Sequence, residues 1–169
     1  MTVTLATTRL QLVPPGPQHL DAHAAFYASP RAAERGWSAT EPESWRNFAS
    51  VIGHAALRGF GPFVAERDGQ AIGLFGPWHP GGQVEAEIKW ILWDAASEGL
   101  GLAHEAALAT RTYAYEALGW TTAASFITAD NARSQALARK LGASPDRDWH
   151  TPSGKLVTIW RHPSPEVSA

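Results

Sequence analysis

The segment from Trp93 to Ala106, WDAASEGLGLAHEA, has the residue pattern of an anion-binding turn. Gly99 and Gly101 lack a Cβ atom, so a ligand can approach the backbone closely at these two positions. The residues that follow have helical periodicity, and the first amides of a helix have no partner within it. Those N–H groups, together with the positive end of the helix dipole, favour a phosphate group. The turn therefore predicts a site for a diphosphate.

Other interpretations of this turn compete with a diphosphate site. A P-loop requires Gly-Lys-Ser/Thr at its end, and Gly101 is followed by Leu102, Ala103 and His104, which excludes that motif. A dinucleotide-binding fingerprint is disfavoured because the turn lies in mid-chain, after several predicted strands. An isolated G-x-G pair is also typical of a tight turn that only packs a helix on a sheet, and the glycines alone fit this structural role as well as ligand binding.

Glu87 is the candidate general base. It lies on an otherwise apolar stretch, 84–93, shortly before the glycine turn, where a carboxylate needs a functional or structural reason. An ion pair with Lys89 is the alternative role and fits the sequence equally well. Glu85 is a second candidate, nearer the solvent end of the strand. Strand alternation predicts one face with Glu85, Glu87, Lys89 and Ile91, and the opposite face with Ala86, Ile88, Trp90 and Leu92.

Two other groups of residues have less support. His19 and His23 are four residues apart on a predicted helix, but no third ligand accompanies them, so we expect a solvated helix face and no metal site. Ser125 has no histidine and aspartate at a recognisable spacing, which argues against a hydrolase triad.

Strand and helix patterns surround these residues. Strands are predicted over 3–13, 63–66, 71–75, 84–93, 120–128 and 155–161, with Asp68-Gly69 as the turn of a hairpin. Helices are predicted over 17–29, 44–57, 99–118 and 131–141, with residues 31–43 as a loop or broken helix. This order predicts one α/β (α+β) domain with a mixed sheet over residues 1–162, followed by a flexible tail over 163–169.

Composition limits the function further. The chain has 169 residues, of which 44% are hydrophobic and 8 are Trp, enough for one globular domain with a core. The net charge of -2 gives no overall field for a nucleic acid or an anionic membrane, so we expect neither as a partner. The absence of cysteine excludes a disulfide framework, a thiolate metal site and a cysteine nucleophile. With no long apolar run, the sequence predicts a cytoplasmic protein.

Three motifs, in order, resemble the GNAT N-acetyltransferases, particularly the branch that includes RimJ and RimL. Residues 87–106, EIKWILWDAASEGLGLAHEA, resemble the acetyl-CoA signature of that family. Residues 7–30 resemble the branch's opening strand and helix, and residues 130–143, DNARSQALARKLGA, resemble its late N-x-x-S helix. The resemblance implies a GNAT-like fold, with a mixed, mostly antiparallel sheet, helices on both faces and two strands that splay to admit pantetheine. It also implies metal-free transfer of an acetyl group from acetyl-CoA, the co-substrate, to a primary amine by direct attack in a ternary complex.

The resemblance also implies roles for individual residues. Asn131 matches the asparagine that holds the pantetheine arm, and Ser134 matches a serine near the departing sulfur, which gives it both a binding and a catalytic role. Leu92 and Trp93 would offer backbone groups to pantetheine. The pyrophosphate would lie against Gly99, Leu100, Gly101, Leu102, Ala103 and His104. Because the resemblance places acceptor recognition around the first two helices, Trp37, Trp45 and Phe48 are candidates for acceptor binding, although core packing is the commoner role of such a stripe. Glu85 is a further candidate for acceptor binding.

The chain departs from the family pattern at three notable positions. Leu100 stands where Arg or Lys is usual, Glu98 where an aromatic residue is usual, and Ala138 where many relatives have the tyrosine that protonates the thiolate. We therefore expect weaker phosphate affinity and a Glu98 side chain that points away from the cofactor. These departures make a non-catalytic acyl-CoA or small-ligand binding module the alternative function, and a structural partner domain a third.

The acceptor decides how much a general base matters. At pH 7 an α-amino group with a pKa of about 7.8 is neutral in about one molecule of seven, whereas a lysine amine at about 10.4 is neutral in fewer than about one in a thousand. A base is therefore most important for a lysine-like acceptor. The sequence leaves the acceptor open between a small-molecule amine and a protein N-terminus, and a homodimer is an expectation from the family.

Overall fold

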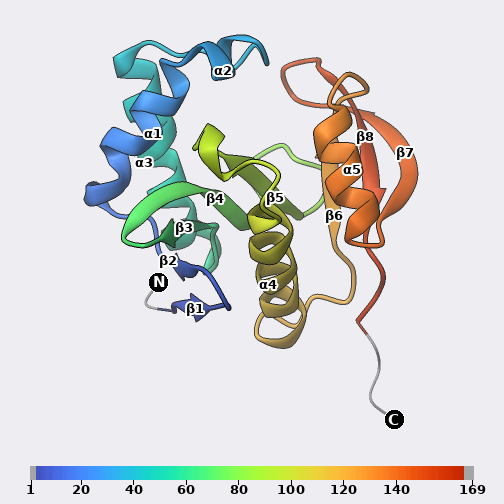
Figure 1. Ribbon diagram of the computed structural model, residues 1–169. Helices are drawn as coiled ribbons and strands as arrows, with labels where there is room; N and C mark the ends of the chain where they lie inside the picture. The colour runs from blue at the N-terminus through green and yellow to red at the C-terminus, as the bar shows by residue number, and fades with distance from the viewer. Residues whose placement is uncertain (1–2, 166–169) are drawn as a thin grey trace.

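The computed structural model describes residues 3–165. Within this range eight strands form one sheet in the order β1-β2-β3-β4-β5-β6-β8-β7, in which only β5 and β6 are parallel neighbours (Figure 1). The strands are β1 (Leu5–Ala6), β2 (Gln11–Val13), β3 (Phe63–Arg67), β4 (Gln70–Trp78), β5 (Glu87–Leu92), β6 (Ala124–Ile127), β7 (Ser144–His150) and β8 (Leu156–Arg161). The predicted mixed, mostly antiparallel sheet is confirmed.

Helices cover both faces of this sheet (Figure 1). On one face Phe26 and Phe48 pack against Val64 and Leu74, and on the other Leu102 and Ala106 pack against Phe63 and Phe75. Burial of each large apolar side chain contributes about 2 kcal/mol, so these two layers hold the central strands in place. The helices are η1 (Pro17–His19), α1 (Leu20–Tyr27), α2 (Pro30–Ala33), α3 (Glu41–Arg58), η2 (Ala95–Ser97), α4 (Leu102–Glu116) and α5 (Ala132–Lys140).

The parallel strands β5 and β6 separate after a single pairing, Glu87 with Ala124. Beyond that point, side chains form the bonds that a regular ladder would make between backbones. The Ser125 hydroxyl donates to the Ile88 carbonyl at 2.7 Å, and the Phe126 N–H donates to the Glu87 carboxylate at 3.3 Å. The sheet therefore opens between its two halves beside Glu87, as the resemblance implies.

The predicted hairpin turn is confirmed by its backbone conformation. Asp68 and Gly69, between β3 and β4, have φ angles of 51° and 77°, so both lie in the left-handed region. A two-residue turn of this kind matches the twist of antiparallel strands, and Asp-Gly is a preferred sequence for it.

The helix boundaries differ from the prediction around residues 30–43. α3 begins at Glu41 because Glu43 accepts hydrogen bonds from both the N–H and the hydroxyl of Thr40, at 2.8 and 2.7 Å. This capping box extends the helix three residues beyond the predicted start. The short α2 lies in the segment predicted as a loop or broken helix, and Ser29 caps it.

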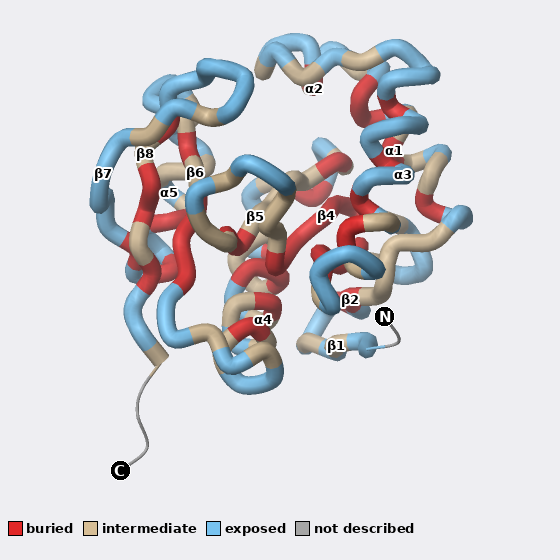
Figure 2. Tube along the Cα trace, turned by 180° about the vertical axis from the view of Figure 1, so that it is seen from behind, coloured by how far each residue is buried: buried red, intermediate tan, exposed pale blue. Residues whose placement is uncertain are grey.

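β7 was not predicted, and the long first strand is instead two short ones. The β7 sequence, SPDRDWH, has no apolar alternation because the strand lies at the exposed edge of the sheet, as Figure 2 shows by its pale blue colour. Charged residues and a proline are typical of edge strands, which must avoid further pairing. None of the helices described is long and apolar enough to span a membrane. The domain boundary at residue 162 stays a prediction, and residues 166–169 of the predicted tail lie outside the described range.

Candidate active site

The glycine turn presents the N-terminus of α4 to a cleft. Gly99 and Gly101 have φ angles of 74° and 78°, a left-handed conformation that favours glycine, and no atom lies within 4 Å of where a Cβ at Gly99 would be. Gly101 is the N-cap of α4, and the first amide to bond within the helix is that of Glu105, which donates to the Gly101 carbonyl at 3.1 Å. The N–H groups that precede it, of Leu102, Ala103 and His104, are therefore available to a ligand.

The cleft at this helix end has a volume of about 410 Å³. Gly99, Gly101, Leu102, Ala103 and His104 form one part of its wall, and Trp90, Ile91 and Leu92 of β5 form another. We call it the cofactor cleft.

Four basic side chains that sequence reasoning missed also line the cofactor cleft. They come from α2, the segment after it and α5, namely Arg31, Arg35, Arg133 and Lys140. These residues supply positive charge to the cleft, in place of the Arg or Lys that the family usually has at the position of Leu100. The cleft is therefore basic although the turn itself has no basic residue of this kind. Arg133 and Lys140 lie inside the motif of residues 130–143, whereas Arg31 and Arg35 carried no sequence signal for this position.

Glu98 lies between two of these arginines. One of its carboxylate oxygens is 2.5 Å from Nη1 of Arg31 and 2.6 Å from Nη1 of Arg133, so an acidic residue of the turn joins α2 to α5. Glu98 also lines the cofactor cleft. The expectation that it points away is wrong, because pairing with two guanidinium groups favours an inward position.

Leu100 lies outside the wall of the cofactor cleft and is 46% exposed. Its carbonyl accepts a hydrogen bond from Arg9 at 2.8 Å, and Arg9 is in turn paired with Glu105 of α4 at 2.7 Å. These contacts hold the turn from its outer side. Any cofactor contact by Leu100 would have to come from its backbone.

The end of β5 supplies one of the two predicted pantetheine contacts to the cleft. Leu92 lines the cofactor cleft, and its carbonyl accepts a hydrogen bond from Arg31 at 3.1 Å. The N–H of Trp93 donates to the Ile72 carbonyl of β4 at 2.8 Å, and the Trp93 side chain is buried among α1, α3 and β4. The backbone donor of Trp93 is therefore already used within the sheet.

A second cleft, of about 570 Å³, lies on the other side of the splayed strands. Its wall includes Glu87 and Lys89 from β5, Phe126 from β6, and Tyr27 from α1. We call it the acceptor cleft. The two clefts share four wall residues, Trp37, Trp90, Ile91 and Ser134, so they meet at the opening between β5 and β6.

Glu87 and Lys89 are adjacent charges in the acceptor cleft. Burial raises the pKa of the Glu87 carboxyl, while the positive charge of Lys89 and the hydrogen bond from Phe126 act in the opposite direction. Burial lowers the pKa of Lys89, and its Nζ lies 4.8 Å from the centre of the Trp78 ring. In the described range these two residues form no direct ion pair within 4.0 Å, so Lys89 does not occupy the oxygens of the buried Glu87 carboxylate.

Ser134 and Asn131 begin α5 at the junction of the clefts. The Asn131 side chain caps the helix by accepting from the Ser134 N–H at 3.2 Å, and it also accepts from Arg35 at 3.3 Å. It borders the acceptor cleft. The Ser134 hydroxyl accepts a hydrogen bond from the indole N–H of Trp90 at 3.1 Å. Ala138, one turn further along, is fully buried against β6 and β8, where a tyrosine would not fit without movement.

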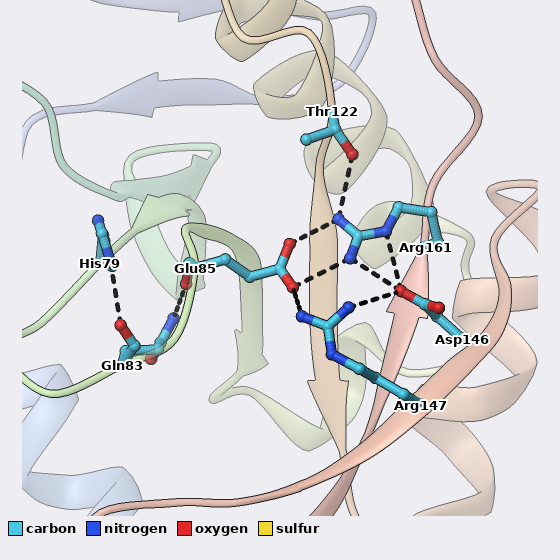
Figure 3. A network of polar contacts seen from close by, with 7 residues as sticks. All are labelled: His79, Gln83, Glu85, Thr122, Asp146, Arg147 and Arg161. Carbon is cyan, nitrogen blue, oxygen red and sulfur yellow. Dashed lines mark hydrogen bonds and ion pairs between the residues drawn. The ribbon is translucent and has the colours of Figure 1, made fainter.

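Glu85 is held in a network outside the acceptor cleft (Figure 3). Its carboxylate binds both terminal nitrogens of Arg161, at 2.5 and 3.0 Å, and Nη2 of Arg147 at 2.8 Å. Asp146 accepts from both arginines as well. Two cations already compensate the Glu85 charge, so it is not available to bind an amine. The network instead joins the start of β5 to β7 and β8.

Of the predicted acceptor-binding residues, only Trp37 lines the acceptor cleft. Trp45 is 58% exposed on α3, and Phe48 is buried in the core, with its ring 4.9 Å from that of His23. Both lie outside the two cleft walls. The helical spacing correctly predicted an amphipathic helix. It could not distinguish an apolar face that packs against the sheet, as observed, from one that binds a ligand.

The two helical histidines are buried and not solvated, which corrects our expectation. His19 accepts from the Gly16 N–H at 3.0 Å and lies 3.0 Å from Glu66. His23 lies 3.1 Å from the Ser44 hydroxyl, and burial, with a smaller effect of Lys89, lowers its pKa to about 4. Among residues 3–165 no group of three or more metal-ligating side chains occurs.

Ser125 has a histidine partner that the sequence spacing did not reveal. Its hydroxyl lies 2.9 Å from Nε2 of His162, whose Nδ1 faces Arg111 at 3.3 Å. An arginine in the place of an aspartate cannot orient a catalytic histidine as in a triad. This chain of contacts joins α4, β6, β5 and the residue that follows β8.

Comparison with known proteins identifies the family. The model of the acetyltransferase (GNAT) domain matches residues 9–144 of the chain. The chain belongs to the GNAT family. It is therefore an acyl-CoA-dependent acetyltransferase, and the mostly antiparallel sheet that opens at β5 and β6 is the sheet of a GNAT domain.

Solved structures agree with the family. An acetyltransferase from Agrobacterium tumefaciens str. C58 is 30% identical, with a TM-score of 0.86 over 96% of this chain and 95% of that one. RimL, a ribosomal L7/L12 alpha-N-protein acetyltransferase solved with coenzyme A, is 16% identical, with a TM-score of 0.75 over 95% and 97%. The aminoglycoside acetyltransferase AAC(6')-Ib, also solved with coenzyme A, is 17% identical, with a TM-score of 0.74 over 91% and 93%. No curated protein sequence matches this GNAT chain significantly.

Proposed function

We propose that this GNAT protein transfers an acetyl group from acetyl-CoA to a primary amine by direct attack in a ternary complex. The observation that carries the proposal is the meeting of two clefts at Trp37, Trp90, Ile91 and Ser134. One cleft ends at a helix N-terminus with basic side chains, and the other contains a buried carboxylate. An acyl donor and an amine bound in the two clefts would have their reactive groups at the same junction, which favours direct transfer.

Acetyl-CoA fits the chemistry of the cofactor cleft. Diphosphate oxygens would accept from the amides of residues 99–104, and Arg31, Arg133 and Lys140 would balance the negative charge. The cleft continues from the α4 N-terminus along β5 to Ser134, so a pantetheine arm would lie between the turn and the junction. Leu92 and Asn131 are the proposed contacts of that arm, as the family resemblance implies.

Glu87 is the proposed proton acceptor. The amine nitrogen attacks the thioester carbon, the carbon–sulfur bond breaks, and its electron pair leaves with the thiolate. The proton lost by the nitrogen passes to the Glu87 carboxylate, directly or through water. A pKa raised by burial makes this carboxylate a better proton acceptor, and the nearby Lys89 charge helps to keep it ionised. Ser134 would donate a hydrogen bond to the developing thiolate.

The acceptor is proposed to be a protein N-terminus or a small-molecule amine, with the RimJ/RimL-like branch as the nearest type. The names of two structural neighbours support this range, because RimL modifies a protein α-amine and AAC(6')-Ib is an aminoglycoside acetyltransferase. The carboxylates of Glu43 and Glu87 and the ammonium groups of Lys89 and Lys155 all line the acceptor cleft. Such a balanced set of charges favours an acceptor with one amine over a polyamine.

Initial-velocity kinetics tests the proposal. Thiol release should depend on the amine, and double-reciprocal plots against acetyl-CoA at several amine concentrations should intersect. A peptide with a free N-terminus and no lysine is compared with the same peptide after N-terminal acetylation, which should be inert. Parallel plots, or an acetylated enzyme formed without amine, would contradict direct attack. Cofactor binding without amine-dependent thiol release across a broad amine panel would favour the non-catalytic binding module.

A further inference from the structure

The indole of Trp90 forms a hydrogen bond with the Ser134 hydroxyl. Trp90 lies on β5 and Ser134 on α5, and the indole Nε1–H donates to the serine Oγ at 3.1 Å. Both residues belong to the small group that borders the cofactor cleft and the acceptor cleft together. The hydrogen bond is therefore located where the thioester of an acyl donor would meet the amine.

A serine near the start of a helix usually has local uses for its hydroxyl proton, such as a bond to a backbone carbonyl of the preceding turn. Ser134 is the third residue of α5, and its N–H is already bound to Asn131. Within residues 3–165 its Oγ accepts from Trp90 and donates to no protein group. The hydroxyl proton is therefore not committed to the helix.

The chemistry of indole makes this arrangement directional. An indole N–H can only donate, whereas a hydroxyl has one proton and two lone pairs. Trp90 takes up one lone pair of Ser134, so the serine proton must point elsewhere. A glutamine or histidine at position 90 could also accept, and would then be able to turn the proton away from the cleft.

Packing fixes the direction of the indole itself. The Trp90 ring lies edge-on to that of His162, with centroids 6.2 Å apart, and it contacts three separate core clusters between β5 and the helices α4 and α5. A side chain held on several sides loses little further entropy when it forms a hydrogen bond. The N–H direction is thus set before any ligand binds.

We propose that Trp90 is a positioning residue that holds the Ser134 hydroxyl as a donor toward the sulfur of the acyl donor. The inference rests on the proposed acetyl transfer and adds a residue to it. When the carbon–sulfur bond breaks, the electron pair that moves to sulfur is stabilised by the serine O–H, and no proton needs to leave the serine. Trp90 acts through Ser134 and does not itself touch the reacting atoms.

Kinetics of four variants test this role. Trp90→Phe keeps the aromatic ring but removes the N–H, and Ser134→Ala removes the donor. Trp90→Phe/Ser134→Ala combines them, and Trp120→Phe is the control, because that indole packs against Phe60 away from both clefts. We expect kcat to fall about tenfold in Ser134→Ala and about fivefold in Trp90→Phe. The double variant should match Ser134→Ala, the KM for acetyl-CoA should stay within about twofold, and the control should behave as wild type.

The outcomes separate this inference from the proposed function. If Trp90→Phe reduces kcat by the same factor with and without Ser134, the indole acts only through packing and the inference is wrong. A wild-type kcat in Trp90→Phe also overturns it. If the wild-type protein releases no thiol in response to any amine, the proposed function fails, and the role of Trp90 fails with it. A failure of this inference alone would instead leave wild-type activity intact and appear only in the variants.

Discussion

Replacement of Glu98 by glutamine should tighten the binding of CoA, although Glu98 lines the cleft that binds it. The carboxylate lies 2.5 Å from Arg31 and 2.6 Å from Arg133, so it occupies the two guanidinium groups that a phosphate would use. Glutamine has nearly the same shape and no charge. Glu98→Gln therefore removes a competing anion without changing the turn.

The size of the expected change in CoA affinity follows from how exposed the three charged side chains are. The Glu98, Arg31 and Arg133 side chains are 33%, 18% and 67% exposed, so each pair contributes at most about 1 kcal/mol. Repulsion between a carboxylate and a phosphate about 4 Å apart adds about 1 kcal/mol in water. If binding must disrupt part of this pairing, the total is about 1–2 kcal/mol, or a Kd for CoA about 5–30 times lower in Glu98→Gln.

Isothermal titration measures this effect directly. CoA and pantetheine, which lacks the phosphates, are titrated into wild type and Glu98→Gln at low and high salt. CoA should bind more tightly to the variant and pantetheine should not, and the gain should shrink in high salt. Glu116→Gln, an equal charge change at the far end of α4, is the control and should bind CoA as wild type does. Equal or weaker CoA binding in Glu98→Gln would show that the carboxylate arranges the arginines for the ligand and does not compete with it.

Three further predictions follow from the geometry. Gly101→Val places a branched side chain at a φ of 78°, with its Cβ 3.5 Å from Arg9 on the outer side of the turn; relief of this backbone strain should displace the amides of residues 102–104 and weaken CoA binding by at least about 100-fold by titration, whereas Gly119→Val, at a φ of 70° and outside both cleft walls, should be strained but bind normally. Because Glu87 must be ionised to accept a proton and burial raises its pKa, kcat at saturating amine should fall on acidification already above pH 4.5, separately from the fall that protonation of the free amine causes in kcat/KM, and Glu87→Gln should lose this kcat limb and turn over about 100 times more slowly at unchanged CoA affinity. Burial lowers the pKa of both His23 and His162 to about 4, so the unfolded chain binds these two protons first, and each histidine should lower the free energy of unfolding by up to about 3 kcal/mol between pH 6.5 and 4 in urea titrations; a flat profile would contradict both assignments.

The fold was largely predictable where apolar patterning is strong. The hairpin at Asp68-Gly69, the alternation of β5 and the helix α4 each have a local cause in the sequence, and all three are present. β7 has no such cause, because its pairing with β8 depends on backbone bonds at an exposed edge where side chains carry little information. The start of α3 was also predictable, because Thr40-Glu41-Pro42-Glu43 has the T-x-x-E pattern of a capping box, but the prediction began the helix at residue 44 and missed this signal.

The parts of the site formed by one local segment were predictable from the sequence. The parts formed by side chains from segments far apart in the sequence were less so. Gly99, Gly101 and Ser134 were found from local motifs, and each borders the cofactor cleft. Arg31 and Arg35 reach the same cleft from a segment about 100 residues before α5, and no local spacing indicates that. Glu85 was misjudged for the same reason, since the arginines that bind it come from β7 and β8.

A crystal structure of the protein with CoA tests the central claim most directly. We predict diphosphate oxygens within hydrogen-bond distance of the amides of residues 99–104, and the sulfur at the junction of the two clefts beside Ser134. A diphosphate bound away from the α4 N-terminus, or a sulfur directed away from the gap between β5 and β6, would contradict the account.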